Sequence, residues 1–286
     1  MEPATNSLYE IRIRPDQSWL NPDIRGLIEY RDLLVMLVRR DFVLKFKQTV
    51  LGPAWYLLQP LLTTVVFTIV FNQVARLPTD GLPPTLFYLG GITIWNFFLQ
   101  NLNSTSNTLL NNESLYGKVY FPRLIVPLAI TCNHLVTFAI QLTTLIVFII
   151  FFKLRGSHFD AHPIAALLLT PCLLAQTAAL SLALGLSLSC FTVKYRDLTQ
   201  LVGFLLQIWM YATPVIYPAS RFPEHLRWIM YLNPVGPIVE NFRGLFLGVS
   251  SVTPLQTVTS VALTSVLFLI GLALFRRTER TFVDLI

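Results

Sequence analysis

Residues 124–152 read LIVPLAITCNHLVTFAIQLTTLIVFIIFF, a stretch that contains no Asp, Glu, Lys or Arg. A helix needs about 20 apolar residues to cross the ~30 Å hydrocarbon core of a bilayer, and this stretch exceeds that length. In lipid the backbone must satisfy its own hydrogen bonds, so a segment of this kind is expected to be helical. Residues 124–152 therefore predict a transmembrane helix.

Uncharged tracts of this kind occupy most of the 286-residue chain. They run 48–75, 81–112, 124–152, 161–193, 198–220 and 244–275. Strands of a transmembrane barrel are ~10 residues long and alternate in polarity, unlike these tracts. The sequence thus predicts an all-α membrane protein with six transmembrane helices, at about 54–74, 86–108, 126–151, 164–191, 198–217 and 255–275.

Composition and charge support this class and set an orientation. The chain is 54% hydrophobic and 13% charged, with a mean hydropathy of +0.60, whereas soluble domains are about 25% charged. Of the 21 Lys and Arg residues, 15 fall in the N-terminal segment, the connections at 113–123 and 194–197, and the C-terminal tail. Positive charge collects on the cytoplasmic side, so both termini are expected there. Loop cations also account for the net charge of +6, so no nucleic-acid partner is expected.

Three parts of the chain are predicted. Residues 1–25 form a polar, proline-containing arm, residues 26–51 an amphipathic helix on the cytoplasmic membrane surface, and residues 52–286 the transmembrane domain. Within 26–47, one helical face carries Tyr30, Leu33, Leu34, Leu37, Val38 and Leu44, and the other carries Glu29, Asp32, Arg39, Arg40 and Lys47. The alternative is a soluble helix that packs on the domain's own loops.

The longest outer connection, about 218–253, contains an apolar piece that is too short to span. Residues 228–239 are uncharged and include Pro234, Gly236 and Pro237, which favours short re-entrant or interfacial helices. Glu240 and Arg243 follow at i and i+3, a spacing that allows an ion pair on a helix. A charged pair near the membrane suggests a functional role, and a local salt bridge is the equal alternative.

Small residues recur at four-residue spacing in the fourth predicted span. One row comprises Ala175, Ala179, Ala183 and Ser187, and another comprises Ser181, Gly185 and Ser189. Such rows let helix backbones approach closely. Packing within the chain is expected rather than a dimer seam.

Catalytic chemistry is not expected of this chain. The sequence has no Gly-x-x-x-x-Gly-Lys-Ser/Thr phosphate loop and no Gly-x-Ser-x-Gly nucleophile turn. His158, His162 and His225 lack metal-ligand spacing, and His134, inside the third span, is expected to bond a neighbouring helix. No metal or cofactor is expected on the chain, and energy for transport would come from elsewhere.

Aromatic and amide side chains near the span ends are the remaining signal. An interfacial aromatic belt explains most of them. A sharper hypothesis places some in a passage, where flat rings stack on sugars and amides bond hydroxyls. The candidate path residues are Trp55, Tyr56, Trp95, Phe98, Gln100, Asn101, Trp209 and Tyr211. Gln100 and Asn101 belong to the polar second half of the second span, which should face protein or water rather than lipid.

Four stretches together resemble the permease subunit of an ABC-2 type exporter. They are DFVLKFKQTVLGPAWYLLQP (41–60), YFPRLIVP (120–127), VKYRDL (193–198) and YLNPVGPIVENFRGLFLG (231–248). The first is similar to a basic interface helix that enters a Leu-Gly-x-x-Trp corner, and the last to the Asn-Pro…Glu…Arg…Gly pattern before the final span. The resemblance runs from about residue 30 to the C-terminus and is closest to exporters of O-antigen, capsule and teichoic acid.

The resemblance implies an inner-membrane homodimer with two cytoplasmic ATPase subunits that hold ATP and Mg. Membrane lipids surround it, and its substrate would be a lipid-linked glycan. The implied ATPase-facing residues are Arg39, Arg40, Lys45, Lys47, Tyr116, Lys118, Arg123, Lys194, Arg196 and Asp197. Asn233, Pro234, Glu240 and Arg243 would belong to the outer re-entrant helices.

Other functions stay open at this point. An ABC-2 permease for a drug, lipid or other small molecule has the same composition. A membrane-embedded polyprenyl-lipid enzyme would need clustered acidic residues, and Glu113, Asp197 and Glu240 form no obvious cluster in the sequence. An oligomeric scaffold or passive channel would function without an ATPase.

Overall fold

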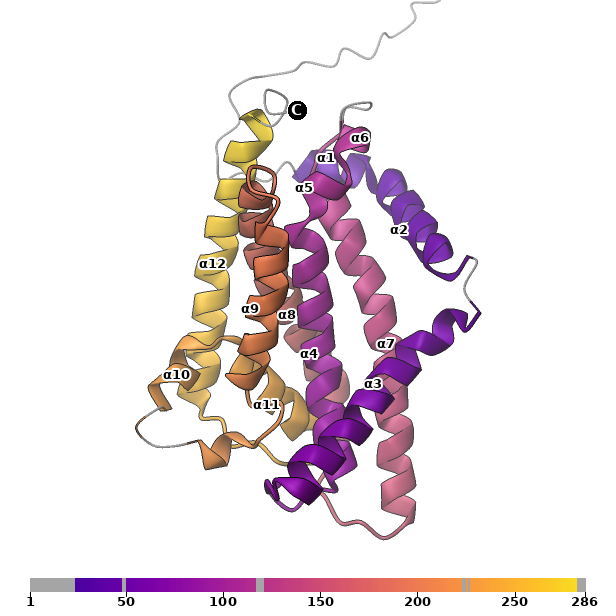
Figure 1. Ribbon diagram of the computed structural model, residues 1–286, viewed down its shortest axis with the longest axis vertical. Coiled ribbons are helices and arrows are strands. Elements are labelled where there is room, and N and C mark those ends of the chain that lie inside the picture. Colours follow the sequence, from indigo (N-terminus) through magenta and orange to yellow (C-terminus); the bar gives the residue numbers. More distant parts are fainter. Residues whose placement is uncertain (1–23, 48–49, 117–120, 223–224, 226, 282–286) are drawn as a thin grey trace, which may run out of the picture.

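The computed structural model describes residues 24–47, 50–116, 121–222, 225 and 227–281, and every regular element in these residues is helical (Figure 1). The N-terminal half contains α1 (Ile24–Glu29), α2 (Arg31–Phe46), η1 (Gly52–Ala54), α3 (Trp55–Phe67), the π-helix η2 (Thr68–Val74), α4 (Pro84–Ser106), α5 (Thr108–Asn111), α6 (Glu113–Tyr116) and α7 (Ile125–Leu154). The C-terminal half contains α8 (Pro163–Thr192), α9 (Leu198–Tyr211), η3 (Ala219–Arg221), α10 (Arg227–Leu232), α11 (Val235–Leu247) and α12 (Pro254–Thr281).

Four helices among the described residues are long and apolar enough to cross a membrane. They are Gly52–Val74, Ile125–Leu154, Pro163–Thr192 and Pro254–Glu279. The two other predicted spans are also helices, but α4 is more polar and α9 has only 14 residues, or about 21 Å at 1.5 Å per residue. The expected fifth span, 198–217, ends as a helix at Tyr211 because Pro214 lacks an amide hydrogen and disfavours helical geometry at Thr213.

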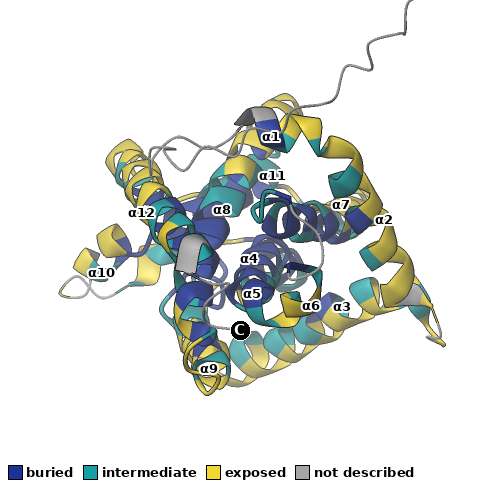
Figure 2. Cartoon of the chain, turned by 90° about the horizontal axis from the view of Figure 1, so that it is seen from above, coloured by how far each residue is buried: buried dark blue, intermediate teal, exposed yellow. Residues whose placement is uncertain are grey.

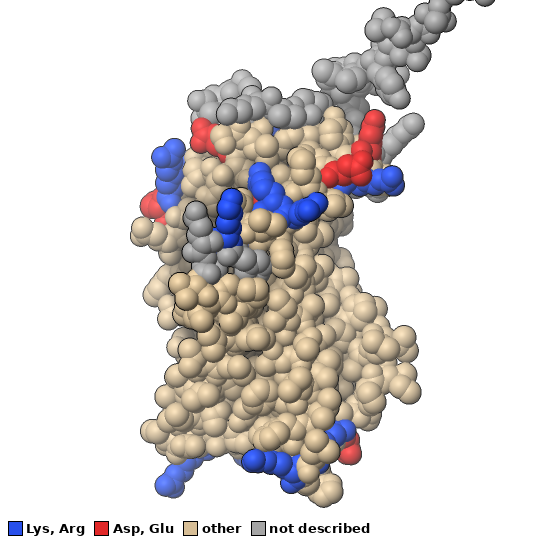
Figure 3. All heavy atoms as spheres, turned by 90° about the vertical axis from the view of Figure 1, so that its right-hand side faces the viewer, with Lys and Arg blue, Asp and Glu red and all other residues tan. Residues whose placement is uncertain are grey.

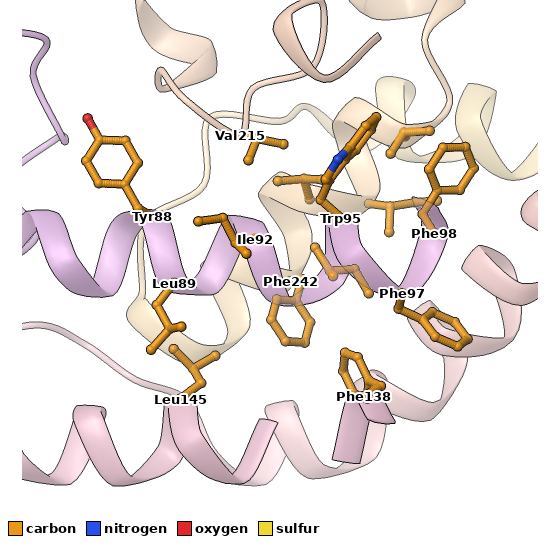
Figure 4. Packing of buried hydrophobic residues seen from close by; sticks show 14 of the residues in the cluster. Tyr88, Leu89, Ile92, Trp95, Phe97, Phe98, Phe138, Leu145, Val215 and Phe242 are labelled. Carbon is orange, nitrogen blue, oxygen red and sulfur yellow. The ribbon is translucent and has the colours of Figure 1, made fainter. Parts of the chain in front are cut away.

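Helix α4 forms the centre of the bundle. Figure 2 shows it buried, with α3, α7, α8, α9 and α12 around it. The aromatic side chains of α4 reach in several directions: Phe97 meets Phe138 of α7 at 5.7 Å between ring centroids, and Trp95 meets Phe98 at 5.5 Å (Figure 4). A helix buried on all sides explains why its polarity need not match lipid.

The polar half of α4 bonds to its neighbours within the bundle. Asn101 donates to the Ser181 hydroxyl on α8 at 2.6 Å and accepts from the Thr131 hydroxyl on α7 at 3.0 Å. His134 Nε2 lies 3.0 Å from the Ser104 hydroxyl. The expectation that these side chains face protein is confirmed for Asn101, and His134 does bond a neighbouring helix.

Small residues bring α8 into close contact with α4 and α12. A Cβ atom added to Gly185 would overlap the Thr105 side chain, and one added to Gly271 of α12 would overlap the backbone of Ala183. Ala183, Ser181 and Ser189 are fully buried in a single chain. Ala183, Ser181, Gly185 and Ser189 therefore serve packing within the chain, as predicted, whereas Ala175 at the start of the first row is exposed.

The N-terminal helices pack on the bundle at the end opposite α11. The expected continuous helix is divided at Tyr30 into α1 and α2, and α2 lies against α7. Leu37 is 2% exposed, and Tyr30, Leu33, Leu34 and Val38 pack beside it. Leu44 of the predicted apolar face is instead 59% exposed. We call the two ends of the bundle the α2 end and the α11 end.

Charged side chains gather at these two ends. Figure 3 shows Lys, Arg, Asp and Glu at the top and bottom of one face, with a broad uncharged band between them. The long helices also leave large apolar side chains exposed, among them Leu62, Val147, Leu167 and Leu269. An uncharged, apolar band of this kind matches the hydrocarbon core of a bilayer.

Candidate functional site

The short helix α11 is fixed by the residues at its two ends. Val235 at its start donates its amide to the Asn233 side-chain oxygen at 3.1 Å. Gly248 ends it in the left-handed conformation, at φ 79°, which favours glycine. Nine residues of α11 are buried, so this helix lies inside the protein and is too short to cross a membrane.

Glu240 and Arg243 form a buried ion pair on α11. Arg243 Nη1 lies 2.7 Å from Glu240 Oε1, and the side chains are 1% and 3% exposed for Arg243 and Glu240 respectively. Arg243 Nη2 also donates to the carbonyl of Pro214 at 3.0 Å, and the guanidinium lies 3.8 Å from the centroid of Phe87. A buried charge is tolerated when it is paired and bonded in this way.

The carboxylate of Glu240 joins two further segments. It accepts from the backbone amide of Ala219 at 3.4 Å, and from the amide and hydroxyl of Ser251 at 3.4 and 3.3 Å. The ion pair thus links α11 to α4, to the segment after α9 and to the loop before α12. The predicted pair exists, and its environment is that of a structural junction.

Asn233 forms a second junction at the same end. Its side-chain oxygen accepts from the indole of Trp209 at 3.1 Å, and its amide donates to the carbonyl of Ala212 at 3.1 Å and the hydroxyl of Thr213 at 3.0 Å. With the bond from Val235, Asn233 connects α9 to α11 through both ends of its amide. Pro234 accepts from the Ser260 hydroxyl on α12 at 2.6 Å.

The candidate path residues do not share one surface. Trp95, Phe98 and Asn101 are 2%, 0% and 0% exposed in the core. Trp209 is half-buried and packs edge-on against Phe98 at 5.4 Å. In this conformation Trp95, Phe98 and Asn101 support the bundle from its interior, and Trp209 packs on Phe98 from α9.

The other path candidates are accessible but lie on three different helices, α3, α4 and α9. Trp55 and Tyr211 are each 53% exposed, and Gln100 and Tyr56 are half-buried. Trp55 and Tyr56 begin α3, and Lys45 lies 5.9 Å from the Tyr56 ring centroid. Tyr211 ends α9 beside the α11 end (Figure 1).

At the α2 end, one predicted loop residue is anchored. Arg123 Nη1 donates to the carbonyl of Glu279 on α12 at 2.6 Å, and its backbone amide donates to the Glu279 carboxylate at 3.3 Å. Its guanidinium lies 5.8 Å from the centroid of Tyr116, which stacks on Phe121. Burial raises the pKa of Tyr116, so this phenol stays neutral.

The remaining residues of the predicted ATPase-facing set are exposed at the same end. Arg39, Lys45 and Lys47 are exposed on or after α2, and Arg40 pairs with Asp41 at 2.7 Å. Lys194, Arg196 and Asp197 are exposed in the turn between α8 and α9. Lys118 lies outside the described residues.

Several contributors to these junctions carried no sequence signal. Phe87 is one of many aromatic residues, and Pro214 and Val215 contribute through their carbonyls. Ser251 and Glu279 are distant in sequence from the charges they meet. Among the described residues, no group of three His, Cys, Asp or Glu side chains could hold a metal ion.

Comparison with known proteins decides the family. A model of the ABC-2 type transporter family matches residues 32–247, most of the chain. This chain belongs to the ABC-2 type transporter family. The match includes α2, the whole bundle up to α9, and α11 with its ion pair. As an ABC-2 permease, the chain is a multi-pass component of the inner membrane.

Individual relatives are similar over nearly their full length. An O-antigen export system permease protein RfbA of Klebsiella pneumoniae is 24% identical over 256 residues, covering 89% of this chain and 95% of the relative. An O-antigen export system permease protein RfbA of Myxococcus xanthus is 28% identical over 225 residues, covering 78% and 83%. The similarity thus covers more than four fifths of each of these relatives.

Proposed function

We propose that this ABC-2 permease is the transmembrane subunit of an ATP-driven exporter of a lipid-linked polysaccharide such as O-antigen. The observation that carries the proposal is its similarity, over almost the full length, to permeases that are named for O-antigen export. The sequence contains no nucleotide-binding loop of its own. In the proposal, ATP and Mg therefore bind to a separate cytoplasmic subunit.

The proposed topology has six crossings and both termini in the cytoplasm. Helix α4 crosses inside the bundle, where α3, α7 and α8 shield its amides from lipid, and α9 crosses together with residues 212–217. The greater number of Lys and Arg residues at the α2 end supports the proposal that this end lies inside. The α11 end is then the outer end.

The α2 end is the proposed docking face for two ATPase subunits. Exposed side chains of α2 and of the α8–α9 turn lie at this same end (Figure 1), including Arg39, Lys194 and Arg196. The bonds from Arg123 to Glu279 tie the loop before α7 to the end of α12. A push on this loop would therefore reach two membrane helices at once.

A second copy of the chain is proposed to pack on the face formed by α3 and α9. Figure 2 shows these helices along one side of the molecule with exposed residues outward. Leu62 of α3 is 59% exposed, and Phe204 and Leu205 of α9 are 60% and 51% exposed. Trp55, Tyr56, Gln100 and Tyr211 are the path candidates that two such chains could place along a shared passage.

An export assay in cells tests this function. A strain that lacks the chain should keep its lipid-linked glycan on the cytoplasmic side, and the wild-type gene should restore surface glycan in an ATP-dependent manner. Surface glycan is detected with a glycan-binding lectin on intact cells, and total glycan on lysed cells. Unchanged surface glycan in the deletion strain, with total glycan also unchanged, would rule out the proposed role.

A further inference from the structure

A groove opens between α8 and α12 beside α11. It encloses about 1010 Å³ and is lined by α8 from Leu169 to Ala179, by α12 from Thr257 to Leu269, and by α11. The α12 lining covers 12 residue steps, or about 18 Å of helix. A volume of this size lies at the upper end of the range for small-molecule sites.

The groove changes in polarity along its length. At the α11 end its walls carry His162, Asn241 and Ser250, whereas Leu169, Phe268 and Leu269 line it further from that end. Gln176 and Ser265 also line this further part, but their polar groups bond within the protein. The neighbouring side chains Leu167 and Leu168 are 78% and 67% exposed, so the mouth of the groove opens toward the apolar band. A ligand that is polar at one end and apolar at the other matches this profile.

One hydroxyl in the groove has no hydrogen-bond partner. Thr264 of α12 lines the groove and is 4% exposed, and its Oγ1 atom is buried without a partner. The nearby polar groups bond each other instead: Gln176 donates to Ser260 at 2.9 Å, and Asn241 donates to Thr257 at 3.0 Å. A buried hydroxyl without a partner is costly, so a ligand that reaches Thr264 would relieve this cost.

We propose that this groove binds one glycerophospholipid of the outer leaflet, with its ester region at His162, Asn241 and Ser250 and an unsaturated acyl chain along α12. Thr264 lies seven residues after Thr257, the partner of Asn241 at the polar end, about 10 Å along the helix. The middle of an acyl chain reaches this depth, and the π electrons of a cis double bond there accept a weak hydrogen bond from the hydroxyl.

Charge distinguishes this ligand from the other lipid in the proposed function. A diphosphate-linked isoprenoid carries a strongly anionic head group, which calls for Lys or Arg, whereas a zwitterionic glycerophospholipid such as phosphatidylethanolamine balances its phosphate with its own ammonium group. No Lys or Arg is among the described residues that line the groove. A helix of a second copy would in turn be apolar along its length and would leave the polar end and Thr264 unmatched. The leaflet assignment rests on the proposed topology, whereas the lipid site does not depend on what is exported.

Photo-crosslinking of the full-length chain tests the site. The protein is placed in vesicles of phosphatidylethanolamine and phosphatidylglycerol that contain a phosphatidylethanolamine with a mid-chain diazirine. Label should concentrate on 169–179 and 257–269. Ala179→Phe should lower it at least about fivefold because the ring fills the groove, whereas the matched control Val147→Phe, on the exposed face of α7, should stay within about twofold of wild type.

Variants of Thr264 and the alkylation of Cys172 provide two further tests. Thr264→Val should remove a preference of about threefold for unsaturated over saturated probe, and Thr264→Ser should retain it. If Ala179→Phe does not fold, the wild-type protein is tested by itself. Added phospholipid should slow the alkylation of Cys172, an exposed thiol in the groove wall. Label spread over all exposed helices, unslowed Cys172 alkylation, or displacement of the probe by an equimolar isoprenoid diphosphate would overturn the proposal.

Discussion

Arg243 and Glu240 pair at 2.7 Å in the interior of the protein, and Arg40 and Asp41 pair at the same distance on its surface. The two pairs differ in burial, with side-chain exposures of 1% and 3% in the first pair and 44% and 28% in the second. Removing one partner of a buried pair leaves an uncompensated charge, whereas an exposed pair is screened by water. The two pairs have equal N–O distances, but mutation of the buried pair should cost more stability.

Arg243→Ala should destabilise the permease by roughly 3–5 kcal/mol, while Arg40→Ala should cost less than about 1 kcal/mol. Thermal unfolding in detergent, followed by size-exclusion chromatography, compares the two variants directly. Replacing both Glu240 and Arg243 by leucine should be milder than either single change. Similar unfolding temperatures for Arg243→Ala and Arg40→Ala would contradict this account of the ion pair.

Gly91 on α4 should be intolerant of a side chain because the Arg243 guanidinium packs against it. A Cβ atom there would lie 2.7 Å from Arg243 Nη2 and 3.3 Å from the Val215 carbonyl oxygen. Gly91→Ala should cost about 1–3 kcal/mol through overpacking. The matched control is Gly203→Ala on α9, where a Cβ would meet nothing within 4 Å, and it should be neutral or slightly stabilising. A neutral Gly91→Ala would show that Arg243 is not fixed as described.

The six-crossing topology predicts opposite sides for the ends of α4 and of α9. Single cysteines, in a variant with the three native cysteines replaced, should react with an impermeant maleimide on spheroplasts at positions 75 and 221. Cysteines at positions 113 and 195 should react only after permeabilisation. The native residues Ala75, Arg221, Glu113 and Tyr195 are exposed. Labelling of positions 75 and 113 from the same side would show that α4 does not cross.

Arg123 should matter for transport more than for folding if its loop transmits force to α12. Arg123→Gln removes the bond from Nη1 to the Glu279 carbonyl and should reduce export severalfold, since hydrogen bonds from charged groups contribute about 1.5–3 kcal/mol. Arg221→Gln, an exposed arginine at the opposite end, is the control. Surface glycan is normalised to membrane-inserted protein. Normal export by Arg123→Gln would exclude this coupling route.

Much of the fold followed from the sequence because uncharged tracts specify helices without reference to their partners. A helix lies in each of the six predicted spans, although the fifth ends six residues early at Tyr211, and the i, i+3 spacing of Glu240 and Arg243 gave the correct pair. The fate of Trp95 and Phe98 could not be predicted, since an aromatic ring near a helix end has the same sequence signature in a core, a belt or a passage. The contacts of Phe87, Ser251 and Glu279 likewise depend on tertiary packing.

Two helix boundaries differ from those predicted: the break between α1 and α2 at Tyr30, and the end of α9 at Tyr211. Tyr30 carries no helix-breaking signal, yet the chain bends there so that Leu37 reaches the core against α7. Pro214 did carry such a signal. The expected helix continued past it because the uncharged tract continues to Ser220.

The proposed function requires that this permease bind a separate ATPase subunit. Affinity purification of the tagged chain from its native membrane, with quantification of every co-purifying protein, tests it most directly. The account predicts a P-loop ATPase in a one-to-one ratio with the permease. A chain that purifies alone, or with a glycosyltransferase and no ATPase, would contradict it.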